Sequence, residues 1–277
     1  MEVARPPGGD IGCESEDRVD LGLSGKVALV AAASKGLGKA SALSLAREGA
    51  RVTICARSES ELEEAADEIR AEAEAEVLAV PADLSGPEGI TAVVEATAEH
   101  FGGIDILVNN SGGPALGKFA DFSDDDWRLA FEVVTLNFVR FTRLVVPYMR
   151  ENNWGRIIGI QSSSVKQPVA GIDLSNGTRP GVAGLMKALM PDLAKDGITI
   201  NLVLPGSFLT ERLLGHAARD SDTAANLQAA AAQNIPVGRL GEPRELGDLV
   251  TFLASPRADY ITGATYQIDG GVIRSNV

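Results

Sequence analysis

From Lys26 onward, short apolar segments alternate with segments of helical periodicity, and this alternation restricts the fold more than any other feature of the chain. The apolar segments are almost continuously apolar, as is typical of strands buried on both faces. Repeated strand–helix units form right-handed crossovers and a parallel sheet. We therefore predict one α/β domain over residues 24–277, a doubly wound parallel sheet with helices on both faces. The predicted strands are KVALVAA (26–32), RVTICAR (51–57), VLAVPADL (77–84), GIDILVNNSGG (103–113), GRIIGIQSSS (155–164), ITINLVLPG (198–206) and ATYQIDGG (264–271).

Helical patterns separate these strands. They cover residues 38–49, a strongly charged segment at 59–76, a long segment at 124–152 and a last one at 242–255. The Ala-rich, polar residues 211–234 predict one or two helices over a cleft. Residues 1–23 are rich in Gly, Pro and acidic residues and lack an apolar core, so we expect a flexible extension rather than a signal peptide.

Composition excludes several classes of protein. The 277 residues carry a formal charge of −13, which disfavours nucleic acid as a partner because phosphate binding needs clustered Lys and Arg. The two cysteines, Cys13 and Cys55, form neither a disulfide framework nor a metal cluster, so no metal site is predicted. No apolar run approaches the roughly 20 residues that a membrane span requires. We expect a cytoplasmic protein.

A glycine-containing turn follows the first predicted strand. In AAASKGLGKA (31–40), Gly36 and Gly38 stand where the strand passes into a helix. Backbone N–H groups at such a point can bind a pyrophosphate, and glycine allows the close approach. Two glycines before a helix are weak support alone, because they often serve only tight packing.

Four further segments, in the same order, make the chain resemble the short-chain dehydrogenase/reductase family over residues 24–273. The turn resembles the family's Thr-Gly-x-x-x-Gly-x-Gly, with Ala31 and Ala32 in place of Thr and the first Gly. The resemblance implies a Rossmann-type domain, an adenine contact after the third strand, an Asn-Asn-Ala-Gly-like segment after the fourth and a nicotinamide contact after the sixth, with the closing strand YITGATYQIDGG (260–271). The implied cofactor-binding residues are Ala32, Ser34, Lys35, Gly36, Leu37, Gly38, Arg57, Asp83, Leu84, Asn109, Ser111, Gly112, Pro205, Gly206 and Thr210.

The residues after the second strand favour NADP(H) over NAD(H). NAD sites usually place an Asp or Glu there to bind the ribose 2′-hydroxyl. This chain has Arg57 instead, and a guanidinium suits a 2′-phosphate. Lys35 supplies a second cation at the same end of the site.

The catalytic residues of the family are mostly replaced. The resemblance places the family's Ser on Ser162, its Tyr on Ser175 and its Lys on Arg179, while its Asn falls on Val134, three positions before Asn137. A serine hydroxyl is a much weaker acid than a phenol, whose pKa is about 10, so Ser175 would be a poor proton donor. The chain thus resembles a divergent, 3-oxoacyl-(acyl-carrier-protein) reductase-like branch that lacks Tyr-x-x-x-Lys.

Gly177, Pro180 and Gly181 predict that the helix carrying these replacements begins near residue 180. Residues 175–179 would then form a loop whose N–H groups, with Arg179, suit an anionic or carbonyl substrate. Lys166 is an alternative proton donor, although its position also fits an ordinary loop lysine.

These observations lead to one main hypothesis and two rivals. The first is an NADP(H)-dependent oxidoreductase that transfers hydride to or from a small carbonyl or acyl-thioester substrate, with Ser162, Ser175, Arg179 or water in place of the usual proton relay. The second is a catalytically silent NADP(H)-binding protein or regulatory subunit. The third is an enzyme of another reaction class that uses the same cleft. The resemblance also implies a homotetramer or dimer, with the helix at 124–151 and the helix after residue 180 in the interface.

Overall fold

All seven predicted strands are confirmed in one parallel sheet. The computed structural model describes residues 19–217 and 223–276, and the strand order is β3-β2-β1-β4-β5-β6-β7. The sheet changes direction of winding between β1 and β4, as the predicted doubly wound topology requires. The strands are β1 (Val27–Ala31), β2 (Arg51–Ala56), β3 (Val77–Pro81), β4 (Ile106–Asn109), β5 (Gly155–Ile160), β6 (Ile198–Pro205) and β7 (Thr265–Ile268).

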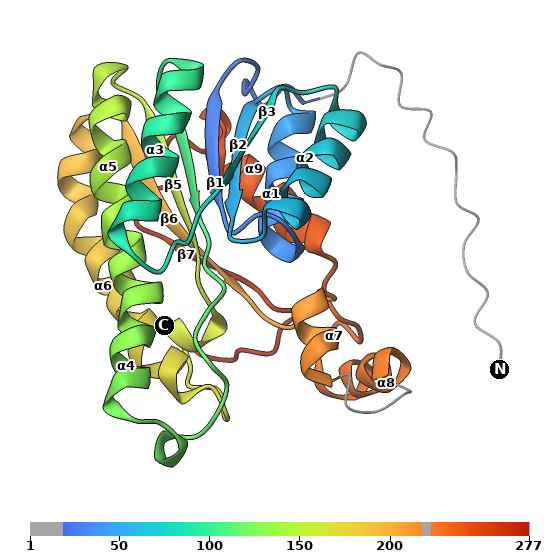
Figure 1. Cartoon of the computed structure of the whole chain (residues 1–277). Helices are drawn as coiled ribbons and strands as arrows, with labels where there is room; N and C mark the ends of the chain where they lie inside the picture. The colour runs from blue at the N-terminus through green and yellow to red at the C-terminus, as the bar shows by residue number, and fades with distance from the viewer. Residues whose placement is uncertain (1–18, 218–222, 277) are drawn as a thin grey trace.

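Helices cover both faces of the sheet (Figure 1). One face carries α1 (Gly36–Arg47), α2 (Glu59–Ala73) and α9 (Pro243–Ala254), and the other carries α3 (Pro87–Phe101), α5 (Asn137–Glu151) and α6 (Asp173–Lys195). Three more helices lie beyond the carboxyl ends of the strands: α4 (Asp124–Phe131), α7 (Glu211–Ala217) and α8 (Thr223–Asn234). The helix α4 lies on one side, and α7 and α8 lie on the other. Two helices therefore form in the Ala-rich segment at 211–234.

Successive side chains of each strand enter opposite cores. Ala28 and Val30 pack with the α1, α2 and α9 layer, whereas Leu29 and Ala31 pack with the α3, α5 and α6 layer. All four are fully buried. Burial on both faces explains why these strands are almost continuously apolar.

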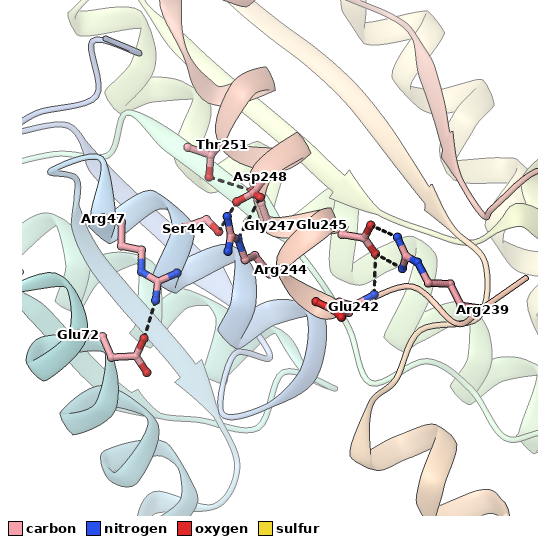
Figure 2. Close-up of polar contacts among 10 residues, drawn as sticks. All are labelled: Ser44, Arg47, Glu72, Arg239, Glu242, Arg244, Glu245, Gly247, Asp248 and Thr251. Atoms are coloured by element: carbon pink, nitrogen blue, oxygen red, sulfur yellow. Dashed lines mark hydrogen bonds and ion pairs between the residues drawn. The ribbon is translucent and has the colours of Figure 1, made fainter. Parts of the chain in front are cut away.

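Close packing of α9 on α1 fixes the frame behind the glycine turn. A Cβ on Gly247 would lie 2.6 Å from Oγ of Ser44 and 2.7 Å from the carbonyl oxygen of Ala40, so only glycine fits there. Figure 2 shows Ser44 of α1 beside α9, where its hydroxyl donates to Asp248 at 3.2 Å. It also shows the start of α9, where the Glu245 carboxylate accepts hydrogen bonds from both Nη atoms of Arg239 at 2.8 and 2.6 Å.

The long helix predicted at 124–152 is interrupted. The residues Glu132–Leu136, between α4 and α5, form a π-helical turn. Such a turn contains an extra residue, so it changes which side chains of the following helix face a given neighbour. This change matters for the site described below.

The prediction that the helix carrying Ser175 and Arg179 begins near residue 180 is wrong. The helix α6 begins at Asp173, and Pro180 lies inside it. The Asn176 side chain stabilises this first turn, because it accepts from the Val169 N–H at 3.0 Å and donates to the Val169 carbonyl at 2.7 Å. Gly177 is required by packing, since a Cβ there would lie 2.6 Å from the Trp127 ring. Residues 175–179 are therefore helical and do not offer a loop of open N–H groups.

Most of the predicted N-terminal extension, including Cys13, lies outside the described residues. Leu23, at its predicted end, is 1% exposed and belongs to the core beside α1, so the packed domain includes it. Within the described part of the chain, no helix is both long and apolar enough to cross a membrane.

Candidate functional site

A cleft of about 1140 Å³ lies at the carboxyl ends of the strands. Its walls come from the segments that follow β1 to β6, together with residues of α4, α6 and α7. Doubly wound domains bind their ligands at this edge of the sheet. Every predicted site residue lines the cleft except Gly38 and Asn109.

The glycine turn lies in the half of the cleft that contains the predicted cofactor-binding residues, which we call the nucleotide half. Gly36 has a φ of +59°, in the left-handed region that favours glycine. Gly38 serves packing instead, because a Cβ there would lie 2.4 Å from the Ala32 carbonyl oxygen. Lys35, the residue at the start of α1, gives that helix no side-chain cap, so the helix N-terminus keeps unpaired N–H groups at the cleft.

Ala32 occupies a conformation that alanine rarely adopts. Its φ is +50°, and it stands where the family's turn has its first glycine. A left-handed non-glycine residue costs about 1 kcal/mol or more. The neighbouring loop holds the turn in place, since Nδ2 of Asn110 donates to the Ala32 carbonyl at 3.1 Å.

Asn109 lies behind the cleft rather than in its wall. It is 2% exposed, and its Nδ2 donates to Oδ1 of Asn137 at 2.9 Å. Asn137 in turn donates to the Leu84 carbonyl at 3.0 Å and itself lines the cleft. Sequence reasoning set Asn137 aside in favour of Val134, which the structure places in the core at 2% exposure. The π-helical turn was the missing signal, because it turns Asn137 toward the cleft.

Three charged side chains surround the predicted 2′-phosphate position. Arg57 is exposed at the rim and makes no ion pair with any described residue. Hydrogen bonds from Ser85 are the main reason that the pKa of Asp83 is lowered, and the charge of Arg57 makes a smaller contribution. Lys35 pairs with Glu61, a carboxylate that sequence reasoning missed, at 3.1 Å. Glu61 lies in the first turn of α2, and its negative charge reduces the net positive charge at this position.

The three predicted catalytic residues, Ser162, Ser175 and Arg179, line the other half of the cleft, which we call the chemistry half. Oγ of Ser162 accepts from the Ser164 N–H at 3.2 Å and so caps a short 3-10 turn. Ser175 is 6% exposed, and its hydroxyl has no hydrogen bond to the described residues. Nη1 of Arg179 donates to Oε1 of Gln161 at 3.1 Å. Burial and the nearby charge of Arg212 lower the pKa of Arg179 to about 10, so it stays protonated at neutral pH.

No strong proton donor replaces the missing tyrosine. Among residues 19–217 and 223–276, those lining the cleft include no tyrosine, histidine or cysteine. Lys166 caps the short turn after Ser162 and does not line the cleft. The described residues also contain no cluster of three or more His, Cys, Asp or Glu able to hold a metal ion. The arrangement can therefore hold and polarise a ligand through hydroxyl and guanidinium donors.

The fold and the cleft define a doubly wound α/β protein, and comparisons with known proteins define its family. Residues 31–273 match the family model described as enoyl-(acyl carrier protein) reductase. A 3-oxoacyl-(acyl-carrier-protein) reductase of Vibrio cholerae is 36% identical over 252 residues, which cover 91% of this chain and 99% of that protein. The chain belongs to the short-chain dehydrogenase/reductase family, a family of oxidoreductases.

Solved structures agree with this assignment. L-sorbose reductase from Gluconobacter frateurii, complexed with NADPH and L-sorbose, is similar with a TM-score of 0.89 and 35% identity, covering 93% of this chain and 100% of that one. A 7α-hydroxysteroid dehydrogenase complexed with NADH has a TM-score of 0.84 at 27% identity, covering 92% of this chain and 97% of that one. Relatives that share the fold therefore bind either nicotinamide cofactor.

Proposed function

We propose that the protein is an NADP(H)-dependent reductase, similar to 3-oxoacyl-(acyl-carrier-protein) reductases, that acts on a carbonyl or hydroxyl substrate through an atypical catalytic site. One observation carries the proposal: a single cleft brings together the glycine turn, Arg57, the segment Pro205–Gly206 and the three predicted catalytic residues, Ser162, Ser175 and Arg179. Membership of an oxidoreductase family and the NADPH complex of a similar reductase support it.

The residues of the nucleotide half fit a nicotinamide dinucleotide phosphate. The uncapped N-terminus of α1 suits the pyrophosphate, and the unpaired guanidinium of Arg57 suits a 2′-phosphate. Asp83 and Leu84 line the cleft where the adenine is expected, and Pro205, Gly206 and Thr210 line it where the nicotinamide is expected. When bound, this cofactor supplies or accepts the hydride.

The chemistry half would act mainly by positioning. Ser162 and Ser175 offer hydroxyl groups to the substrate oxygen, and Arg179 supplies a fixed positive charge beside them. A water molecule held by these donors would deliver the proton to that oxygen. Positioning can account for a large share of such a barrier, so activity does not require the phenol.

The rival proposal is a catalytically silent NADP(H)-binding protein or regulatory subunit. The observation that favours it is the absence of any tyrosine or histidine among the described residues of the cleft. The third alternative, another reaction class in the same cleft, predicts chemistry without consumption of cofactor.

Titration calorimetry with NADPH and NADH, followed by turnover assays on a panel of ketones and 3-oxoacyl thioesters, tests the proposal. We expect NADPH to bind at least ten times more tightly than NADH, and its absorbance at 340 nm to fall with at least one carbonyl substrate. Binding without turnover across the panel would favour the silent protein. If neither nucleotide binds, the oxidoreductase proposal is wrong.

Assembly and location remain predictions. We expect a homotetramer or dimer with α4, α5 and α6 in the interface, which sedimentation of the purified protein would check. The expected location is the cytoplasm.

A further inference from the structure

The cleft contains a buried arginine that no carboxylate among the described residues neutralises. Arg179 is 7% exposed, its guanidinium donates to the neutral Gln161 side chain, and its Nε has no hydrogen-bond partner in the described part of the chain. A buried cation usually has an acidic partner, because removing an unpaired charge from water is costly. Arg156 shows the usual arrangement here: it is 1% exposed and pairs with Asp259.

A second guanidinium lies beside the first. Arg212 belongs to α7 at the exposed rim, but its guanidinium points inward and Nη2 donates to the Pro114 carbonyl at 3.2 Å. A Cβ on Gly113 would lie 2.8 Å from Nη1 of Arg212 and 3.1 Å from Nη2 of Arg179. The two cations therefore converge over Gly113, and their mutual repulsion contributes to the lowered pKa of Arg179.

Three of the four acidic residues that line the cleft have other partners. Asp126 accepts from the N–H and the hydroxyl of Ser123, and Glu61 pairs with Lys35. The remaining two, Asp83 and Glu211, lie on the nucleotide side, where Asp83 accepts from Ser85 and Glu211 approaches Gly36. Within the described part of the chain, none forms an ion pair with Arg179 or Arg212. Within that part of the chain no side chain supplies the negative charge, and a bound anion would supply it.

The position of the pair indicates which ligand. Arg179 lies one helical turn after Ser175, and its partner Gln161 directly precedes Ser162, so the pair borders the reaction site. The uncapped helix end expected to receive the cofactor phosphates belongs to α1, a different wall of the cleft. Apolar side chains, including Leu116, Leu129 and Leu174, also line the cleft and suit a hydrocarbon portion of a ligand.

We infer that Arg179 and Arg212 form a carboxylate-binding site, and that the substrate is an oxo acid or hydroxy acid whose anionic end this pair holds. The inference deepens the proposed function and rests on it. Guanidinium groups match a carboxylate through paired, charge-assisted hydrogen bonds. A phosphate, such as that of an acyl carrier's thioester arm, shares this anionic chemistry and is the competing source.

Calorimetry with matched probes tests the inference without requiring turnover. The probes are benzoylformate and levulinate, the methyl ester of each, and inorganic phosphate, titrated into the protein alone and into the NADP⁺-loaded protein. We expect at least one acid to bind ten times or more tighter than its ester. The variants R179Q and R212Q should each lower that preference about tenfold, which corresponds to about 1.4 kcal/mol. The variant R143Q, on the exposed surface of α5, should leave it unchanged.

The outcomes separate this inference from the proposed function. If the protein binds an acid but neither nucleotide, the anion site is upheld and the reductase proposal fails. Equal affinity for acid and ester, or a preference that survives R212Q, would overturn the anion site. Tighter binding of phosphate than of either acid would replace the carboxylate by a phosphate ligand and so overturn the inference. R212Q changes a rim residue, so the test remains decisive if R179Q fails to fold.

Discussion

The two halves of the cleft use the same strand ends but differ in how far they keep the family's pattern. The nucleotide half retains the glycine turn, an uncapped helix N-terminus and a loop asparagine that holds the turn. The chemistry half keeps the backbone of α6 and exchanges its working side chains, with Ser175 and Arg179 where the family has Tyr and Lys. This difference indicates that the backbone frame of the nucleotide half and the catalytic side chains of the chemistry half can change independently.

The largest expected effect tests the frame of the nucleotide half. In Gly38→Ala, the new Cβ would lie 2.4 Å from the Ala32 carbonyl oxygen and 2.9 Å from Nδ2 of Asn110. Because backbone must move, we expect the free energy of unfolding to fall by about 2–3 kcal/mol. We also expect NADPH affinity to fall about 100-fold, equivalent to about 2.8 kcal/mol. Urea unfolding and calorimetry measure the two effects.

Gly184→Ala is the matched control, because a Cβ at this exposed position of α6 meets nothing within 4 Å. It should raise the free energy of unfolding by up to about 1 kcal/mol through helix propensity. If Gly38→Ala bound NADPH like the unchanged protein, close packing of the turn would not be needed for the nucleotide half.

The next effect concerns cofactor choice. Arg57→Ser removes the rim guanidinium, and a charge-assisted hydrogen bond is worth about 1.5–3 kcal/mol. NADPH affinity should therefore fall about 10- to 100-fold while NADH affinity stays the same. The matched variant Glu61→Gln releases Lys35 from its ion pair and should raise NADPH affinity a few-fold. Calorimetry with both nucleotides measures each change; equal losses for NADPH and NADH would remove Arg57 from the 2′-phosphate site.

The fold and the position of the glycine turn could be predicted from the sequence for physical reasons. The seven strands and the glycine turn depend on local patterns, namely burial on both faces of the sheet and close backbone packing at the turn. The start of α6 was missed because the rule that places Pro in a first turn neglects Asn176, whose side chain secures the earlier turn. Arg212 was missed because only tertiary packing brings it beside Arg179.

Asn137 and Glu61 show the same limit. The π-helical turn brings Asn137 to the cleft, and no residue pattern identified that turn in advance. Glu61 lies in the strongly charged segment predicted as a helix at 59–76, and nothing in that pattern indicated that its carboxylate reaches Lys35, before α1. Long-range pairing of charges is thus the part of a site that a single sequence reveals least.

A smaller effect tests the chemistry half. A true general acid contributes about 10²- to 10⁴-fold to the rate. We expect Ser175→Ala to lower kcat less than about tenfold, because a serine hydroxyl is a poor acid and would serve mainly as one donor to the substrate oxygen. Steady-state kinetics on the best carbonyl substrate measure this.

Ser44→Ala, a serine between α1 and α9 away from the cleft, is the control and should leave kcat unchanged (Figure 2). A loss of 100-fold or more in Ser175→Ala alone would make Ser175 the proton relay. The two halves would then differ in residue type but not in function.

The smallest expected effect lies at Ala32, where the nucleotide half itself departs from the family. Ala32→Gly removes a methyl group from a residue at φ +50°, which relieves about 1 kcal/mol of strain but adds about 0.4–1 kcal/mol of unfolded-chain entropy. The free energy of unfolding should therefore change by less than about 1 kcal/mol. NADPH should bind about two- to fivefold more tightly, because the methyl group no longer narrows its approach to the turn. Ala33→Gly, at a fully buried neighbour without positive φ, should instead destabilise the protein by about 1 kcal/mol or more. If Ala32→Gly weakened NADPH binding, the alanine would be an adaptation of the turn to its ligand, and divergence would extend into both halves of the cleft.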